Sequence, residues 1–548
     1  MNKQLSPLWT HLTSESRLTG TWRDAFPNYQ NQPSPCLGAC PVNGRIAEWI
    51  KQVKHGDLSG AWATLTDNNP FPAIAGRICH HPCETACNRA EHDETVGICS
   101  LERFVGDTAI AEGWGFTPGE DRRQSVAIIG GGPAGLSAAY QLRKYGIQVS
   151  LYEAKDNLGG LMRYGIPSYR LGRDVLNQEI DRIVSMGLDL HLGAEVMDQV
   201  ALASLRKTHD AIFLATGASL PKRVPTLDYE QSWVVDSVDF LAGSVETQKA
   251  QAGAAVVVIG GGSAAMDVAR SARRLGCAVT VLSLEPEGRL PAQQIEITEA
   301  AEEGIRFVSG AMIQTASSGS QNVTLQCVNV EFTLGDTPGS FSANPLVGSE
   351  FTLTADTIIP AIGQDADLDR WQDRGGGDSP VLRIGQDWQT NTLGVFAGGD
   401  VASMSRFVTH AIGMGKDAAH TIAASLLGAE KSPAFESDQL VPIDRINIAY
   451  QEKHERAHQG VTSPDKRLEG FDEVQLPLKA AEAVKEAARC FSCGTCILCD
   501  NCFYYCPDMA ILRVDGGYKI KADYCKGCGL CVAECPTGSI HMQEDTTP

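Results

Sequence analysis

Apolar residues form short uninterrupted runs through the middle of the chain, and glycines directly follow two of these runs. The runs at residues 125–129 and 255–259 predict buried strands of a parallel sheet, because they lack the alternation of a half-exposed strand. Helical stretches at 136–145 and 266–275 follow these two runs, and residues 148–152 are predicted to form the next strand after the first helix. The repeated order of strand, turn and helix predicts a multidomain α/β fold with parallel sheets.

A helical pattern precedes this region. Two amphipathic helices are predicted there, and each has one apolar face. The first face consists of Ile46, Trp49, Ile50 and Val53, and the second of Leu58, Ala61, Trp62 and Leu65. We therefore expect a small all-helical domain ahead of the α/β region.

The glycines after the strand at 125–129 have the spacing of a dinucleotide-binding turn. Gly130 allows the tight turn, Gly132 lets the backbone approach a pyrophosphate, and Gly135 packs the helix against the strand. Glu153 ends the following strand, where a carboxylate accepts ribose hydroxyls. The glycine pattern alone is a weak signal, but strand, turn, helix, strand and acid in this order strongly indicate a dinucleotide site.

The same arrangement recurs later in the chain. Its turn positions are Gly260, Gly262 and Ala265, and its acid is Glu285. A further strand at 394–400 and a helix at 409–427 are predicted to return the chain to the first of the two domains. We therefore expect two dinucleotide sites, with the second domain nested inside the first.

The last sixty residues hold ten of the eighteen cysteines, and eight of these form two runs spaced C-x2-C-x2-C-x3-C-P. This is the spacing of a bacterial ferredoxin with two [4Fe–4S] clusters, in which the fourth cysteine of each run ligates the other cluster. The two crossed ligand sets are Cys496, Cys499, Cys502 and Cys535, and Cys525, Cys528, Cys531 and Cys506. A zinc ribbon or a disulfide framework is the alternative, but zinc sites use two pairs of ligands and not two interleaved runs of four.

Net charge and the grouping of the cysteines indicate the class of partner and the cellular compartment. Lys+Arg 46 against Asp+Glu 66 gives a net charge of −20, which makes nucleic acid and anionic membranes poor partners. No run approaches eighteen uninterrupted apolar residues, and the first residues lack a signal-peptide pattern. Cysteines gathered into metal-type groups fit a reducing compartment. We expect a cytoplasmic protein that does not bind a membrane.

In combination, these motifs resemble the flavin module shared by glutamate synthase small subunits and the N-terminal half of dihydropyrimidine dehydrogenase. The resemblance covers residues 30–430 and includes four motifs beyond the first turn and Glu153. These are 159–167 with Gly160 and Arg163, 215–217 with Thr216 and Gly217, 361–364 with Gly363, and 396–400 with Asp400. The resemblance implies FAD at the first site, with Glu153 on its adenosine ribose and Asp400 near its ribityl chain, and NADH or NADPH at the second.

One departure from the family bears on the nicotinamide cofactor. The family usually has arginines after the second strand of the nicotinamide domain, where they hold the 2′-phosphate of NADPH. This chain has Glu285 there, and a carboxylate repels a phosphate and accepts hydroxyls. The departure predicts a preference for NADH. The alternative is that Arg273, Arg274 or Arg289 reaches the phosphate instead.

The family also places two [4Fe–4S] clusters in its helical domain. The ligand positions of the cluster next to the flavin match Cys40, Cys79 and Cys83, with Glu102 at or next to the fourth. Cys36 and Cys87 match half of the distal cluster, but the Cys-x2-Cys pair that the family has upstream is missing. The resemblance thus implies one N-terminal cluster, and it leaves a second cluster and the role of Cys99 open.

Cys490 and Cys493 are spare by the ferredoxin count. Residues 471–494 resemble the segment that precedes the first cluster in glutamate synthase small subunits, although here they lie before the tail motifs. One hypothesis is that the tail folds back and that this pair completes the distal N-terminal site. A structural role, or an alternative ligand role within the tail, is the other interpretation.

The combined features predict an electron-transfer flavoprotein subunit that links NAD(P)H, FAD and [4Fe–4S] clusters to a ferredoxin or to a catalytic partner, such as a sulfite reductase or a 2-oxoacid oxidoreductase. Such a subunit would form a hetero-oligomer, and a homodimer is also considered. The alternatives are a glutamate synthase small subunit, which would not need the tail, and a non-catalytic redox scaffold or sensor, which would not need intact turns. No Cys-x2-Cys pair directly follows Gly262 or residues 215–217, which argues against disulfide reduction.

A chain of 548 residues is long enough for several domains. The expected domains are a helical iron–sulfur domain (1–120), an FAD domain in two parts (121–250 and 361–430), an NAD(P) domain (251–360), a connector (431–489) and an α+β ferredoxin domain with two clusters (490–548).

Overall fold

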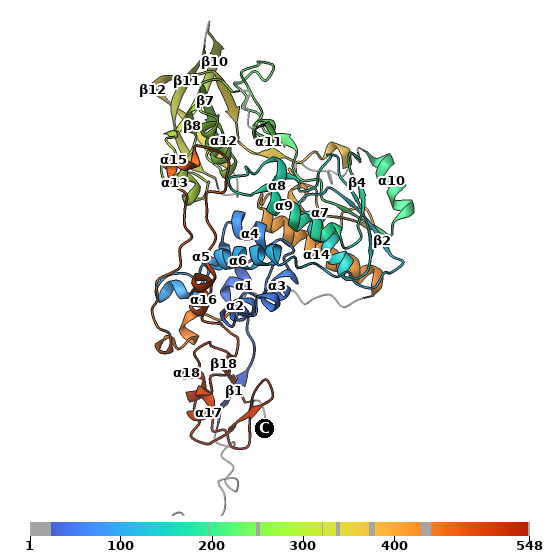
Figure 1. Cartoon of the computed structure of the whole chain (residues 1–548), viewed down its shortest axis with the longest axis vertical. Coiled ribbons are helices and arrows are strands. Elements are labelled where there is room, and N and C mark those ends of the chain that lie inside the picture. The colour runs from blue at the N-terminus through green and yellow to red at the C-terminus, as the bar shows by residue number, and fades with distance from the viewer. Residues whose placement is uncertain are drawn as a thin grey trace, which may run out of the picture.

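The structure is a computed structural model that describes residues 23–196, 198–247, 252–319, 322–335, 340–371, 379–428 and 440–545. Figure 1 shows a helical centre, an α/β domain to its right, a second α/β domain above it and a small tail domain below it. Among the helices in these ranges, none combines the length and the apolar character that crossing a bilayer requires.

Short helices build the central domain. They are α1 (Pro35–Ala39), α2 (Ile46–Lys54), α3 (Leu58–Thr66), α4 (Pro72–Ile78), α5 (Pro82–Thr85) and α6 (Ile98–Ala111). The apolar faces predicted for α2 and α3 are buried, except that Leu58 at the start of α3 is only partly buried. Helices α4 and α6 cross at two glycines: a Cβ at Gly76 would lie 2.3 Å from the backbone nitrogen of Arg103, and one at Gly106 would lie 2.3 Å from that of Ala73. Glycine therefore sets how closely the two helices approach.

The first α/β domain contains a parallel five-stranded sheet in the order β15-β5-β2-β3-β4. Its strands are β2 (Ser125–Ile129), β3 (Gln148–Tyr152), β4 (Asp189–His191), β5 (Ala211–Leu214) and β15 (Val395–Ala397). Its helices are α7 (Pro133–Lys144), α9 (Arg173–Val184), α10 (Gln199–Thr208) and α14 (Val408–Leu427). Helices α7 and α14 pack closely, since a Cβ at Gly415 of α14 would lie 2.1 Å from the carbonyl oxygen of Ala134.

The second α/β domain is inserted between β5 and β15. Its parallel sheet has the order β13-β7-β8-β9, from β7 (Ala255–Ile259), β8 (Ala278–Ser283), β9 (Arg306–Ser309) and β13 (Thr357–Pro360), with helices α11 (Ser237–Thr247), α12 (Ser263–Arg274) and α13 (Gln294–Glu302). The two chain crossings between the domains pair with each other as β6 (Leu220–Pro221) and β14 (Gln364–Asp365). This is the nested arrangement that the sequence predicts.

An antiparallel sheet that the sequence reading did not anticipate is attached to the second domain. It consists of β10 (Ala311–Ser318), β11 (Val323–Leu334) and β12 (Phe341–Ala355) in that order. One face packs on the parallel sheet through Ile313, Leu325 and Leu353, while the far ends of the strands are exposed. The strands therefore alternate buried and exposed positions, which produces no uninterrupted apolar run.

The tail domain is small and contains α17 (Asn501–Tyr504), β16 (Ile511–Val514), β17 (Gly517–Ile520), α18 (Leu530–Ala533) and β18 (Ile540–Glu544). Strand β18 pairs antiparallel with β1 (Ala25–Tyr29), so the first described residues of the chain lie in the tail domain. The expected helical domain of residues 1–120 therefore needs a correction at its start. A five-residue segment with a central proline and a polar Asn28 carried no signal for a distant partner.

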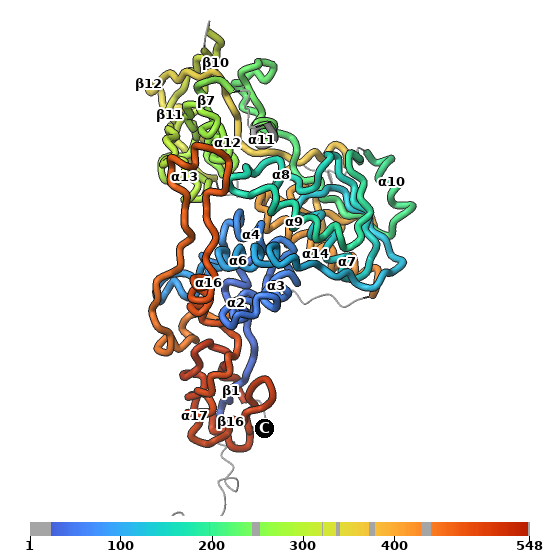
Figure 2. Tube along the Cα trace, viewed as in Figure 1, coloured from blue at the N-terminus to red at the C-terminus, as the bar shows by residue number. Residues whose placement is uncertain are grey.

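The connector runs from the tail to the second α/β domain and back, as the trace in Figure 2 shows. It contains short helices, α15 (Pro464–Arg467) and α16 (Ala480–Ala488). Arg467 of α15 forms an ion pair with Glu302 of α13 at 2.8 Å. Helix α16 buries Ala483 and Ala487 in the core of the central helical domain. Part of the expected connector thus belongs structurally to the helical domain.

Candidate functional site

The first glycine turn joins β2 to α7 and is closed on one side and open on the other. Gly130 has φ +109°, and a Cβ there would lie 2.3 Å from the carbonyl oxygen of Ala215. A Cβ at Gly135 would lie 1.9 Å from the carbonyl oxygen of Gly130. At Gly132 the nearest atom to a Cβ would be the Cα of Gly160, at 3.9 Å. The free space lies at the N-terminus of α7, where a pyrophosphate binds in this type of turn.

Glu153 lies against this turn. One carboxylate oxygen accepts a hydrogen bond from the backbone N–H of Gly131 at 2.7 Å, and the other accepts from that of Lys155 at 2.9 Å. Each oxygen has a second lone pair. The carboxylate is therefore placed at the turn and can still accept ribose hydroxyls, which fits FAD at this site.

Two further positions assigned to FAD lie on loops around this site. Gly160 has φ +53° and precedes α8 (Leu161–Tyr164); a Cβ there would lie 2.9 Å from the Cα of Gly132, so loop and turn meet backbone to backbone. Gly217 has φ +73° and no atom within 4 Å of its missing Cβ, and Thr216 beside it is exposed. The loop at Gly217 therefore leaves room for a bound cofactor, whereas the loop at Gly160 is held closely against the turn.

Arg163 and Asp400 occupy different environments. Arg163 donates to the carbonyl oxygen of Leu158 and to the side chain of Asn177, each at 2.6 Å, so its guanidinium braces the loop around α8. Asp400 lies in the short helix η5 (Gly399–Val401), and burial raises the pKa of its carboxyl to about 6. A donor from a ribityl chain would satisfy this carboxylate, whereas two of the three guanidinium nitrogens of Arg163 already donate to protein groups.

The second glycine turn, between β7 and α12, has the same form as the first. Gly260 has φ +132°, and a Cβ there would lie 2.4 Å from the carbonyl oxygen of Ala361. Gly262 has no atom within 4 Å of its missing Cβ, which leaves the N-terminus of α12 open. Ala265 is fully buried, and Gly363 has φ +98° with open space beside it.

Glu285 holds the position in the second domain that Glu153 holds in the first. Its Oε2 lies 2.9 Å from where a Cβ of Gly261 would be, and the Oε2 of Glu153 lies 3.0 Å from the same place at Gly131. Both carboxylates therefore sit against the middle of their glycine turns. This geometry suits two ribose hydroxyls at either site.

Two of the three arginines considered as ligands of a 2′-phosphate already bind other protein groups. Arg273 donates to the carbonyl oxygens of Cys277 and Glu303, and buried Arg274 forms an ion pair with the Glu303 carboxylate at 2.7 Å. Both lie at the far end of α12, about 15 Å from the turn at a rise of 1.5 Å per residue. Arg289 alone of the three is exposed. Of the three arginines, Arg289 is therefore the one that remains a candidate to bind the 2′-phosphate of NADPH.

One crossed cysteine set of the tail surrounds a cavity of about 310 Å³. The cysteines that line it are Cys506, Cys525, Cys528 and Cys531. Cys506 thus leaves its own run and joins the other, which is the crossover that the ferredoxin spacing predicts. Burial, together with the neighbouring cysteines, raises the pKa of Cys531 to about 12. Bound iron would relieve this cost, because thiolates are its ligands.

The other crossed set is also assembled. Cys535 lies among Cys496, Cys499 and Cys502, and these neighbours add to the burial that raises the pKa of Cys502 to about 11. Burial acts against the thiolate of Cys535, but hydrogen bonds with Ser539 at 3.4 Å and Thr537 at 3.6 Å lower its pKa overall. This thiolate is therefore stabilised for metal binding.

Tyr29 of β1 reaches the same set. Its hydroxyl is buried beside Cys502 and has no well-aligned hydrogen-bond partner among the described residues. A buried hydroxyl without a partner is costly, and a cluster sulfur at this site would accept its hydrogen bond. Sequence reasoning missed Tyr29, since only the pairing of β1 with β18 brings it to the tail.

The flavin-side site of the helical domain contains one more candidate ligand than expected. Cys40, Cys79, Cys83 and Glu102 are neighbours, and Asn69 holds one oxygen of Glu102 at 2.8 Å while the other remains available. Cys99 is buried one helical turn before Glu102 on α6. A hydrogen bond with the Cys99 thiol lowers the pKa of Cys79 to about 7. In the sequence, Cys99 stands three residues before Glu102, which is about one helical turn. This spacing was the signal that could have identified Cys99 as a candidate ligand.

This site lies against the first α/β domain. The sulfur of Cys79 is 3.8 Å from the hydroxyl of Thr409, in the first turn of α14. A Cβ at Gly413, one turn further along, would lie 2.2 Å from the carbonyl oxygen of Pro41, which follows Cys40. Since α14 packs on α7, the same helix touches both the cysteine site and the helix of the first glycine turn.

A second cavity, of about 370 Å³, brings the two ends of the chain together. Its cysteines are Cys36, Cys87, Cys490 and Cys493. The side chains between them are mainly apolar, with Ile46, Ile50 and Phe491 among them. The structure therefore places the two spare tail cysteines beside the two unmatched N-terminal ones.

Ligand spacing separates these cysteine sites from zinc sites. Four thiolates on one zinc ion lie about 3.8 Å apart, given a Zn–S distance of 2.3 Å. Among the described residues, the one trio of His, Cys and carboxylate ligand atoms within 4.8 Å of one another is His81, Glu84 and Cys99. Glu84 is already used, because it accepts from the backbone N–H of Cys99 and from Arg456. At the cysteine sites of the described residues, no three sulfur atoms lie within 4.8 Å of one another, a wider spacing than that of four thiolates on one zinc ion.

Comparison with known proteins agrees with this division of the chain. Residues 124–415 match the family model described as pyridine nucleotide-disulphide oxidoreductase. Residues 22–114 match dihydropyrimidine dehydrogenase domain II with its 4Fe-4S cluster, and residues 518–541 match a 4Fe-4S binding domain. The three matches fall on the two α/β domains, the helical domain and the tail.

Curated relatives share about a third of their residues with this chain. The β subunit of an NADP(+)-dependent formate dehydrogenase from Moorella thermoacetica is 32% identical, covering 84% of this chain and 70% of its own. The small chain of an NADPH glutamate synthase from Azospirillum brasilense is 32% identical, over 73% and 87%. The PreT subunit of an NAD-dependent dihydropyrimidine dehydrogenase from Escherichia coli is 34% identical, over 72% and 92%.

Proposed function

Because this chain belongs to the pyridine nucleotide-disulphide oxidoreductase family and carries cluster-binding domains outside the nucleotide domains, we propose that it is the flavin subunit of an NAD(P)H-dependent electron-transfer enzyme. Its acceptor would be a ferredoxin or a catalytic partner subunit. When bound, the nicotinamide supplies a hydride to the flavin, and the clusters carry the electrons away one at a time.

The observation that carries the proposal is the uninterrupted succession of sites. The flavin-side cysteines touch α14, which packs on the helix of the first glycine turn. Cys40 and Cys36 lie at the two ends of α1, and Cys83 and Cys87 are four residues apart across α5, so these segments join the two N-terminal cysteine sites. Cys493 precedes Cys496 of the tail by three residues. Each site is thus within about one helical turn of the next along the chain.

The tail offers the surface at which an acceptor would dock. Cys499 and Cys528, one from each crossed set, are exposed. Apolar side chains are exposed in the same domain, namely Leu498, Tyr504, Tyr505, Met509 and Leu530. Exposed apolar groups gathered in one place mark protein interaction sites. A catalytic subunit or ferredoxin bound here would lie next to the last cluster sites. Such a partner makes a hetero-oligomer the expected state.

Within this proposal the nicotinamide is NADH, because Glu285 repeats the position of Glu153. Relatives of both kinds exist, named for NADP(H) or for NAD. The alternative, a glutamate synthase small subunit, leaves the tail domain without a role. A purely structural redox scaffold would leave both open glycine turns without one.

The test is anaerobic reduction of the purified chain by NADH, with a one-electron viologen dye as artificial acceptor. Gly262→Val should keep the fold, because no protein atom lies within 4 Å of the new Cβ, but should block the nicotinamide site. Gly115→Val is the matched control, since its Cβ also meets no atom within 4 Å and lies in a surface linker. A wild-type flavin that neither NADH nor NADPH reduces would refute the proposal.

A further inference from the structure

We propose that Cys36, Cys87, Cys490 and Cys493 bind a [4Fe–4S] cluster whose ligands come from the two ends of the chain. The inference rests on the proposed function and deepens it, because this cluster would be the link between the flavin-side site and the tail. Two ligands come from the helical domain and two from the turn after α16, and all four line one cavity.

Each of the four sulfur atoms has a hydrogen-bond donor near it, as cluster ligands require. Ser34 Oγ lies 3.1 Å from the Cys36 sulfur, and Asn88 Nδ2 lies 3.6 Å from the Cys493 sulfur. The backbone N–H of Ser492 donates to the Cys490 sulfur at 3.4 Å, and Cys87 accepts from backbone N–H groups of its own loop. Donors of this kind stabilise thiolate charge and tune cluster potentials.

The cavity suits an iron–sulfur cube better than a single ion. No three of its sulfur atoms lie within 4.8 Å of one another, whereas one zinc ion would hold all four at about 3.8 Å. The space between these sulfur atoms is lined mainly by apolar side chains. Four partly buried thiols at an apolar site are costly to ionise unless a metal pairs with them. A cluster supplies that pairing.

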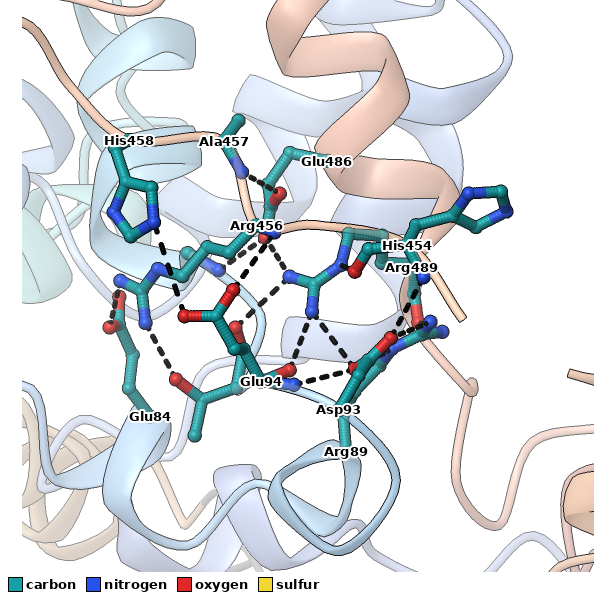
Figure 3. Close-up of polar contacts among 12 residues, drawn as sticks. Glu84, Arg89, Asp93, Glu94, His454, Arg456, Ala457, His458, Glu486 and Arg489 are labelled. Carbon is teal, nitrogen blue, oxygen red and sulfur yellow. Dashed lines mark hydrogen bonds and ion pairs between the residues drawn. The ribbon is translucent and has the colours of Figure 1, made fainter. Parts of the chain in front are cut away.

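A buried ion-pair network, shown in Figure 3, holds Arg489, the residue directly before Cys490. Arg489 donates to Glu486 at 2.7 Å and to Asp93 at 3.0 Å. Its side chain is 2% exposed, and that of Glu486 is 0% exposed. Asp93 also pairs with Arg89 at 2.6 Å, so charges from both ends of the chain compensate one another. Breaking any of these pairs would leave a buried charge uncompensated.

Further contacts hold the same turn from its other side. Arg89 donates to the carbonyl oxygen of Arg489 at 2.5 Å and stacks over the ring of buried Phe491 at 4.9 Å. Gly494 has φ +75°, and its backbone N–H donates to the carbonyl oxygen of Thr537 at 2.7 Å. The turn that carries Cys490 and Cys493 is therefore built into both domains. Such preorganisation is what a shared cluster site requires.

The experiment compares single alanine variants of the full chain, purified without oxygen. Cys36→Ala and Cys490→Ala alter opposite ends of the sequence, yet each should lose about four irons per chain, the content of one cluster. Both should also lose the same signal from the electron paramagnetic resonance spectrum of the reduced protein. Cys277→Ala is the matched control, because Cys277 is a buried cysteine of the second α/β domain, away from the cysteine sites.

Several results would overturn the inference. These are unchanged iron in both variants, loss of different signals from the two variants, or loss of zinc instead of iron. If either alanine variant fails to fold, Asn88→Ala replaces it, since this variant keeps all four ligands and removes one donor. It should shift the midpoint potential of a single cluster while iron is retained, and an unshifted set of potentials would count against the site. Reduction of the flavin by NADH in the wild type tests the proposed function separately.

Discussion

The strongest structural prediction concerns Arg489, whose side chain links α16 to the helical domain. Arg489→Met removes the guanidinium that pairs with Glu486 and Asp93 and that donates to the carbonyl oxygens of Glu94 and Thr95. Removing one partner of a buried ion pair costs about 3–5 kcal/mol, because the other charge remains buried. At 1.4 kcal/mol per factor of ten, the equilibrium for local opening of this contact should rise about 100- to 4000-fold.

Hydrogen–deuterium exchange followed by mass spectrometry measures this opening. Peptides from 452–458 and 480–494 should lose protection, together with those from 89–99, while the sheet of the first α/β domain should not change. Arg513→Met is the matched control, because Arg513 pairs with Asp500 in the tail but is 49% exposed. An exposed pair contributes about 0–1 kcal/mol.

A second substitution separates the charge from the packing. Adding Glu486→Gln to Arg489→Met removes the uncompensated carboxylate and should recover part of the lost protection. Exchange that stays at the wild-type rate in Arg489→Met, or that rises equally in Arg513→Met, would show that this network does not hold the tail in place.

Three other outcomes follow from single residues. Glu285→Ala should lower kcat/KM for NADH about 10- to 100-fold, because hydrogen bonds to a charged group are lost, and it should reduce the difference in kcat/KM between NADH and NADPH. Steady-state kinetics with both cofactors tests this. Unchanged selectivity would contradict the role of Glu285 and favour Arg289 as the residue that determines cofactor choice. Tyr29→Phe should lower the midpoint potential of one tail cluster by tens of millivolts, because a hydrogen-bond donor to a cluster sulfur is lost. Redox titration measures this potential. An unchanged potential would mean that the hydroxyl does not reach the cluster. Burial raises the pKa of Glu179 to about 7, above its unfolded value, so its contribution to stability is present at low pH and is lost as pH rises through 7. The Tm of the wild type should therefore fall more between pH 6 and pH 8 than that of Glu179→Gln, and equal falls would contradict the assignment.

The nucleotide domains could be predicted because their signals are local. A buried parallel strand gives an apolar run, and the turn after it needs glycine where a Cβ would meet a carbonyl oxygen, as at Gly130 and Gly260. The family resemblance and the fold class inferred from these motifs are confirmed by the family matches. The FAD-side role inferred for Arg163 rests on resemblance alone and stays a prediction; in the structure its Nε and Nη2 donate to Leu158 and Asn177.

Non-local contacts could not be predicted in the same way. The exposed half of β10–β12 reads like loop, because alternation with long polar stretches gives no clear period. Cys99 had no family counterpart, and only its place on α6 brings it to Cys79 and Cys83. The pairing of β1 with β18 depends on residues more than 500 positions apart, for which a single sequence carries no signal.

The two ends of the chain complete each other, and this changes how the tail is to be understood. By its motif the tail is a separable ferredoxin. In the structure, β1 supplies a strand and Tyr29 to the tail, while the turn after α16 supplies Cys490 and Cys493 to the helical domain. The backbone N–H of Gln32 donates to the carbonyl oxygen of Gly494, and that of Gly494 donates to Thr537. These hydrogen bonds join the N-terminal segment, the turn after α16 and the end of the tail. A ferredoxin that moved freely would break the succession of cysteine sites at Cys493, whereas a tail held by buried charges keeps that succession at fixed spacing.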